Sequence, residues 1–119
     1  MIILSKIDIN VSEIKDRPAM PEGPYKFRIE DFSDVKTDKN GGQYIAVKLK
    51  FDYEGEVYIV SDNYLKLDST KFRDFVKSTG HNDYVEDTID LIGLEGTCIL
   101  SQEEYEGKIN NKVQKYLVA

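Results

Sequence analysis

The sequence predicts a mainly β fold, a small five-stranded barrel preceded by an extended N-terminal arm. Apolar and polar residues alternate over residues 25–30 and 44–51, with the period of two that half-buried strands show. A helical period occurs once, at residues 69–79, and glycine-containing turn sequences separate the strand-like runs. The length of 119 residues suits one domain with a single hydrophobic core.

The first 24 residues predict an arm and a turn that precede the barrel. Ile7, Ile9 and Val11 alternate with polar residues, which indicates a short extended arm within residues 1–17. All three prolines lie in the next segment, residues 18–24, and this clustering marks a turn that leads into the first strand. The barrel is therefore assigned to residues 25–119, within one domain that spans residues 1–119.

The barrel segment predicts three strands, a helix and then a two-strand hairpin. The expected strands cover residues 25–30, 44–53, 57–64, 96–102 and 109–118. The helix begins at Asp68 or Ser69 and ends at Gly80, and a further helical turn is expected at residues 87–93. This order is that of an OB barrel, in which the helix after the third strand covers the open end. An antiparallel sandwich or an α+β sheet fits the same order less economically.

The sequence offers few groups for catalysis or metal binding. The single histidine, His81, lies in a turn, where an exposed side chain is expected. The single cysteine, Cys98, lies in a strand-like run, where we expect a buried apolar residue and no nucleophile. One cysteine excludes an internal disulfide and a cysteine zinc cluster, and no glycine-rich loop carries the Lys-Ser/Thr of a phosphate-binding loop. We expect a protein that is not an enzyme and that binds no cofactor and no metal.

The chain shows no signal for a membrane. No apolar run approaches the roughly 20 residues that a membrane helix needs. The N-terminal apolar stretch is too short, and is followed too soon by an acidic residue, for a secretory signal. A cytoplasmic protein is expected.

Acidic residues are concentrated in one part of the chain. The formal net charge of -6 argues against general affinity for polyanions, yet residues 24–50 carry six basic and four acidic residues. Residues 82–107 carry eight acidic residues and no basic one. The first four of these acidic residues are Asp83, Glu86, Asp87 and Asp90. We expect them on a solvated helix face that can bind a basic protein partner. The spacing of these four does not match a calcium loop.

Lysines and tyrosines on the polar side of the strands suggest single-stranded nucleic acid. Proteins hold single-stranded nucleic acid with cations along its phosphates and with aromatic faces on which its bases stack. If Val57 and Ile59 point inward, Tyr58 lies beside the lysines of the second strand. The candidate DNA-binding residues are Lys26, Arg28, Lys36, Lys39, Tyr44, Lys48, Lys50, Tyr58, Tyr105, Lys108 and Lys112. The alternative is that the lysines only solvate a wet strand face and the tyrosines belong to the core.

Five segments, in order, resemble phage-encoded single-stranded DNA-binding proteins with an OB fold, of the lactococcal siphophage type. They are MPEGPYKFRIED, TDKNGGQYIAVKLKF, YEGEVYIVSDNY, DLIGLEG and EEYEGKINNKV, and the match covers about residues 20–119. The resemblance implies sequence-independent binding of single-stranded DNA during phage replication or recombination, in the host cytoplasm. It also implies a homodimer with phage recombinases or replication proteins as partners.

One departure from this family concerns protein partners. Bacterial relatives recruit partners through an acidic C-terminal tail, whereas this chain ends VQKYLVA, so the acidic region 83–104 is the expected partner surface. Two other functions stay open. One is a phage protein-interaction or anti-host factor that uses the acidic surface without binding DNA. The other, the weakest, is a hydrolase or nuclease that uses Asp83 and Asp87 with magnesium.

Overall fold

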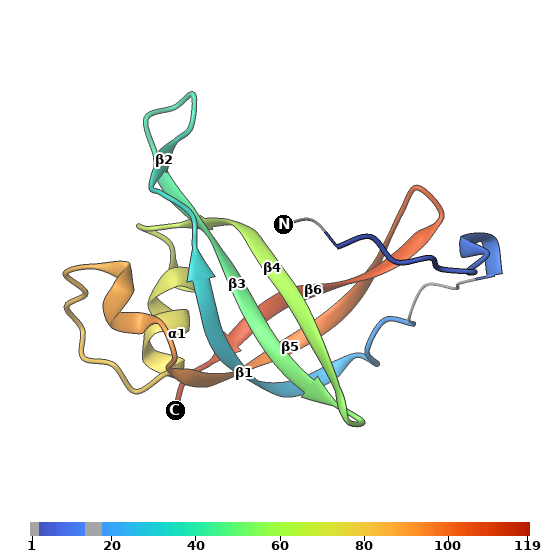
Figure 1. Cartoon of the computed structure of the whole chain (residues 1–119). Helices are drawn as coiled ribbons and strands as arrows, with labels where there is room; N and C mark the ends of the chain where they lie inside the picture. The colour runs from blue at the N-terminus through green and yellow to red at the C-terminus, as the bar shows by residue number, and fades with distance from the viewer. Residues whose placement is uncertain (1–2, 14–17) are drawn as a thin grey trace.

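The computed structural model describes residues 3–13 and 18–119, and these form a mainly β structure with one α-helix (Figure 1). The strands are β1 (Gly23–Phe32), β2 (Lys36–Thr37), β3 (Gln43–Tyr53), β4 (Glu56–Lys66), β5 (Glu95–Tyr105) and β6 (Lys108–Leu117). The helices are α1 (Thr70–Ser78) and two 3-10 turns, η1 (Val11–Glu13) and η2 (Thr88–Leu91). The mainly β prediction is confirmed. The count of five strands is corrected, because the short β2 forms inside the predicted loop.

β1 and β3 follow the predicted alternation. Phe27 and Ile29 of β1 are buried, while Lys26 and Arg28 face solvent. The four buried residues of β3 are the predicted ones, Ile45, Val47, Leu49 and Phe51. These inward side chains supply a large part of the core, so the exposed Lys48 and the partly exposed Lys50 are fixed on the outer face of the sheet.

β4 begins with the opposite phase to the predicted one. Val57 and Ile59 are 46% and 53% exposed, whereas Tyr58 is half-buried and lies opposite Phe51. The tight turn at Glu54 and Gly55, both at positive φ, pairs Tyr53 with Glu56 and so sets this register. Since residues directly opposite each other share a face, Tyr58 lies on the core side. The expected position of Tyr58 beside the outer lysines is wrong.

The sheet is open, which corrects the predicted closed barrel. Residues 23–28 of β1 pair with β5, and its later residues pair with β3 across a bulge between Ile29 and Asp31. The long strands lie in the antiparallel order β4-β3-β1-β5-β6, with β2 against β3. Among the described residues, no ladder joins β4 to β6. Side chains make that connection instead.

A polar bridge joins β4, β6 and α1 where the ladder is missing. The Tyr116 hydroxyl on β6 donates a hydrogen bond of 2.9 Å to Asp62 Oδ2 on β4. Lys71 Nζ of α1 lies 3.2 Å from the same carboxylate and donates to the carbonyl of Val113 at 3.0 Å. Burial, reinforced by the Asp62 charge, raises the pKa of Tyr116 far above its ordinary value. The bridge therefore holds a neutral phenol against a buried carboxylate.

α1 begins and ends where the sequence predicts. Ser69 is the N-cap, and its hydroxyl accepts a hydrogen bond from the Phe72 amide at 3.1 Å. Gly80 follows the last turn at a φ of 77°. The helix packs against β4, β5 and β6, and Phe75 meets Tyr116 with ring centroids 4.9 Å apart. The predicted turn at residues 87–93 is also confirmed, as η2.

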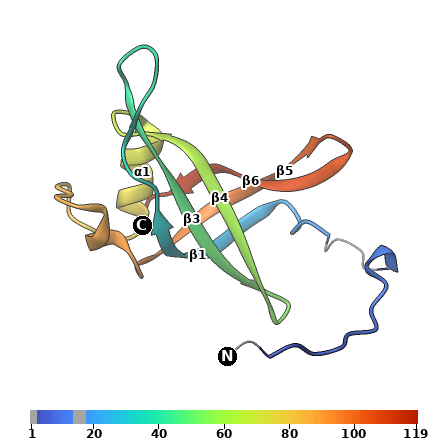
Figure 2. The ribbon, with the colours of Figure 1, turned by 45° about the horizontal axis from the view of Figure 1, so that its top comes forward.

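The segment before β1 is anchored at Met20. This residue is fully buried, its amide donates to Asn111 Oδ1 at 2.8 Å, and its carbonyl accepts from Gln102 Nε2 at 2.9 Å. Before it, residues 3–10 join no ladder and are separate from the sheet, and beyond η1 their trace bends back below the tip of the β3–β4 hairpin (Figure 2). Residues 1–2 and 14–17 of the predicted arm lie outside the described residues.

Cys98 is buried, as predicted, and burial raises the pKa of its thiol to about 12. Such a thiol carries almost no thiolate near neutral pH. In residues 3–13 and 18–119, the helices are all too short or too polar to cross a bilayer.

Candidate nucleic-acid interface

The outer face of β1 and β3 carries four cations, Lys26, Arg28, Lys48 and Lys50, and we call the last three the basic strip. Arg28 lies directly opposite Lys50 in the ladder between the two strands. Lys48 is exposed and lies opposite Asp31 of β1 and Ser61 of β4. Backbone pairing therefore fixes the strip on one face, with acidic neighbours at Asp31, opposite Lys48, and at Glu95 of β5, opposite Arg28.

The cations of the basic strip have no acidic partner within ion-pair distance among the described residues. By contrast, Lys26 pairs with Glu95 at 3.0 Å, and Lys112 pairs with Glu103 at 3.7 Å. Like charges directly opposite each other destabilise a pair of strands, so negative charge beside the Arg28–Lys50 pair is favourable, and Glu95, opposite Arg28 on β5, supplies part of it. A hollow of about 380 Å³ lies there, lined by Lys26, Phe27, Arg28, Lys50, Asp52 and Glu95.

Two tyrosines continue this outer face toward the loop that joins β1 and β3. The rings of Tyr44 on β3 and Tyr64 on β4 have centroids 4.4 Å apart and an interplanar angle of 44°. Tyr64 is 51% exposed, and Lys66 lies opposite Tyr44 in the ladder. The pair thus presents an open aromatic surface next to a cation.

Tyr64 and Lys66 are absent from the predicted set. β4 contains one extra residue between Asp62 and Leu65 relative to β3, and this bulge changes which residues face outward. Simple alternation places Tyr64 on the same side as Tyr58, whereas the bulge puts them on opposite faces. No signal in the sequence locates this bulge.

Asp38 organises the loop above the tyrosine pair. Its Oδ1 accepts hydrogen bonds from the amides of Asn40 and Gly42, both at 2.9 Å, and its Oδ2 accepts from the Tyr64 hydroxyl at 2.7 Å. These donors, Tyr64 first, hold the pKa of the Asp38 carboxyl below its usual range. The same hydrogen bond raises the pKa of Tyr64. Gly41 sits at a φ of 84°, which the tight turn requires.

The loop lysines are exposed at the edge of this face. Lys36 belongs to β2 and pairs with Tyr44, and Lys39 follows Asp38 in the turn. Both therefore lie close in the chain to the tyrosine pair, on a loop that Asp38 ties to β4. The predicted grouping of these two lysines with Tyr44 agrees with this arrangement.

The remaining predicted residues lie on the other hairpin. Tyr105 is 67% exposed and pairs with Lys108 across a turn at Glu106 and Gly107. Lys112 follows on β6. In both ribbon views, this hairpin tip and the β2 loop project on either side of β4 (Figures 1 and 2). The structure thus divides the predicted residues between the β3 face with its loop and the β5–β6 tip.

The acidic residues are exposed but do not share a helix face. Asp83 and Glu86 lie in an irregular segment, Asp87 caps η2 by accepting the Ile89 amide at 3.0 Å, and Asp90 lies within η2. A turn in which Asn82 Oδ1 accepts the Tyr84 amide interrupts the expected helix. No three His, Cys, Asp or Glu side chains are grouped to hold a metal ion in the described part of the chain.

Comparison with protein-family models finds no match, and comparison with curated proteins finds no significant sequence match.

Proposed function

We propose that this chain is a binding protein for single-stranded DNA that acts without sequence preference and catalyses no reaction. The observation that carries the proposal is the basic strip next to the Tyr44–Tyr64 pair, on one face of hydrogen-bonded strands. Cations of this kind hold phosphates, and exposed rings stack unpaired bases of any identity.

Each part of the face has a role in this proposal. Arg28 and Lys50 bind one stretch of DNA backbone, because neither cation forms an ion pair with a described residue, although Asp52 and Glu95 line the same hollow. Lys48 continues the phosphate path along β3. Tyr64, with half of its surface exposed, takes the base, and Asp38 holds its hydroxyl in place. A duplex keeps its bases paired inside, so it cannot use the tyrosine and should bind less tightly.

The strand order supports an OB architecture with an open seam. The long strands lie in the order β4-β3-β1-β5-β6, and α1 separates β4 from β5 along the chain. In OB barrels, the face of the second and third strands and the two flanking loops bind oligonucleotides. In an open barrel of this kind, the corresponding elements would be β3 and β4, with the β2 loop and the β5–β6 tip beside them. We therefore include Tyr105, Lys108 and Lys112 as residues that contact one end of the bound DNA.

The resemblance to phage proteins supports a role in phage DNA replication or recombination in the host cytoplasm, with recombinases or replication proteins as partners. The net charge of -6 keeps the expected affinity modest.

Binding of labelled oligo-dT, followed by fluorescence anisotropy, tests the proposal. Affinity should fall steeply between about 50 mM and about 200 mM salt, because each phosphate contact releases counterions. A duplex of the same length should bind more weakly at every salt concentration. No anisotropy change at micromolar protein in the lowest salt would overturn the proposal.

A second candidate function rests on the acidic segment. Asp83, Glu86, Asp87 and Asp90 are all exposed, and none forms an ion pair with a described residue. A protein-interaction or anti-host factor would use this segment to bind a basic partner. It predicts no oligo-dT binding, together with a stable complex that is lost when these carboxylates become amides.

A further inference from the structure

The N-terminal arm, defined here as residues 3–13, carries apolar side chains that the described chain does not cover. Ile3, Leu4, Ile7, Ile9 and Val11 are 80%, 89%, 76%, 62% and 75% exposed. The radius of gyration is 17.2 Å, against about 14 Å for a compact chain of this length, and the arm projects from the sheet along with the β2 loop and the β5–β6 tip (Figure 1). Several large apolar side chains exposed along one short segment are a feature of interaction sites.

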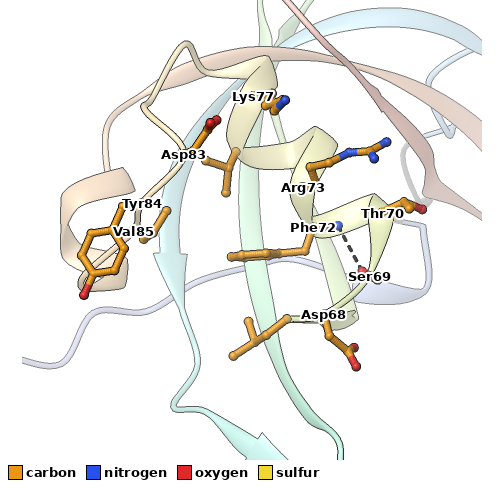
Figure 3. A pocket seen from close by; sticks show the side chains of 11 residues that line it. Asp68, Ser69, Thr70, Phe72, Arg73, Lys77, Asp83, Tyr84 and Val85 are labelled. Carbon is orange, nitrogen blue, oxygen red and sulfur yellow. Dashed lines mark hydrogen bonds between the residues drawn. The ribbon is translucent and has the colours of Figure 1, made fainter.

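A groove with an apolar floor lies between α1 and residues 82–85 (Figure 3). Its volume is about 710 Å³, and its floor is formed by Leu67, Phe72, Val76 and Val85. Figure 3 shows the Phe72 ring pointing from the helix toward Val85. The groove has room for several aliphatic side chains, and its floor is only partly covered by the chain's own residues.

The walls of the groove carry charges of both signs. Arg73 and Lys77 lie on the helix side, and Asp83 lies on the facing segment. Arg73 is paired with its neighbour Asp74 at 3.1 Å. Lys77 and Asp83 form no ion pair with a described residue, so each is available to an occupant of opposite charge.

We propose that the arm of one copy of this chain docks in the groove of a second copy. As an extended strand, the arm places Ile7 and Ile9 on one side and the charged Lys6 and Asp8 on the other. The two isoleucines then meet Phe72 and Val85 in the groove. Lys6 and Asp8, whose charged groups lie 4.0 Å apart on the same side of the arm, then face the open side of the groove, where Lys6 reaches Asp83 and the Lys77 side chain reaches Asp8.

The geometry points to a second copy as the source of the arm. Met20 holds the base of the arm to the β5–β6 hairpin through Asn111 and Gln102. In both ribbon views, the arm leaves on the side of the sheet away from α1 (Figures 1 and 2). The arm and groove of one molecule thus face different directions, and a neighbouring copy brings them together. The contact involves no DNA and stands apart from the proposed function.

A mixed disulfide experiment on full-length chains tests the contact. One preparation carries Ile7→Cys, the other carries Tyr84→Cys in the groove wall, and the native Cys98 is buried and does not compete. After mixing and mild oxidation without DNA, we expect a cross-linked species that contains one chain of each kind. Glu104→Cys, exposed on β5 outside the groove, is the matched control and should not cross-link with Ile7→Cys.

The full-length double variant Ile7→Asp/Ile9→Asp provides an independent readout. Sedimentation velocity should show that the wild type assembles as its concentration rises and that the variant stays monomeric, with an unchanged far-UV circular dichroism spectrum. A wild type that is monomeric throughout, or a cross-link no stronger with Tyr84→Cys than with Glu104→Cys, would overturn the proposal.

Discussion

The ring of Tyr64 on β4 lies against the ring of Tyr44 on β3, with centroids 4.4 Å apart. These residues are 20 positions apart in the chain, and the bulge in β4 brings them to the same face. The pair connects the basic strip to the loop organised by Asp38. It is therefore the point at which base stacking and phosphate binding meet in the proposed interface.

Replacing Tyr64 with Ala should weaken oligo-dT binding. Stacking contributes about 1–3 kcal/mol per base, which corresponds to a loss of roughly 5- to 150-fold in affinity. Anisotropy titrations at constant salt measure this loss. Tyr84→Ala removes a more exposed ring, 75% against 51% for Tyr64, beside α1 and should leave the affinity unchanged. Equal affinities for the wild type and Tyr64→Ala would remove the tyrosine pair from the site.

Replacing Tyr64 with Phe should raise the pKa of Asp38 while keeping the ring. The Tyr64 hydroxyl is the largest cause of the lowered Asp38 pKa, and the Gly42 amide is the next. A carboxyl-detected NMR titration of both proteins measures the two pKa values. An unchanged pKa in Tyr64→Phe would show that the hydroxyl does not hold Asp38 in solution.

The hydrogen bonds that Asp38 accepts have a defined pH dependence. Because the folded-state pKa of Asp38 is lowered, its contribution to stability is present above the unfolded-state pKa. That contribution is lost as the pH falls through the lower, folded-state value. Loop amides at Asn40 and Gly42 should therefore keep their hydrogen-bonded shifts well into the acid range and lose them only at the end of it.

Tyr116→Phe should lower the free energy of unfolding by about 1 kcal/mol, because one buried hydrogen bond to Asp62 is lost. Urea denaturation at neutral pH measures this difference. The pKa of Tyr116 is raised by folding, so its contribution is fully present below the unfolded value of about 10 and is lost above it. Above pH 10, the free energy of unfolding should thus fall less steeply with pH in Tyr116→Phe than in the wild type. Equal slopes for the two proteins would contradict the bridge.

Gly96→Ala should destabilise the fold by about 1–3 kcal/mol through overpacking. A Cβ at this position would lie 2.6 Å from Phe27 Cζ and from Ser78 Oγ, and both residues are buried. Thermal unfolding measures the change. Glu104→Ala, exposed on the same strand, is the control and should be nearly neutral.

Regular alternation was sufficient to predict the inner faces of β1 and β3, and capping residues were sufficient to predict the ends of α1. Ile45, Val47 and Leu49 are apolar at every second position, so only one face of the strand can be buried. Ser69 and Gly80 are residues whose side chain or backbone suits a helix end. These signals are local, and the structure confirms them.

β4 could not be predicted in the same way. Its apolar Val57 and Ile59 face solvent, while the polar Asp62 is buried. Asp62 is stabilised there by Tyr116, 54 residues away in the chain, and by Lys71 of α1. Such partners depend on the tertiary structure, as does the bulge that turns Tyr64 outward. The same side-chain bridge spans the open seam between β4 and β6, and the alternation pattern does not encode it.

Charge reversal on the basic strip tests the proposed interface most directly. Oligo-dT affinity of Lys48→Glu/Lys50→Glu is compared at low salt with that of Lys77→Glu/Lys115→Glu, which makes the same change of charge at exposed positions on α1 and β6. We expect the first variant to lose binding and the second to keep most of it, with both remaining folded by circular dichroism. Equal affinities for the two variants would contradict a DNA site on the outer face of β3.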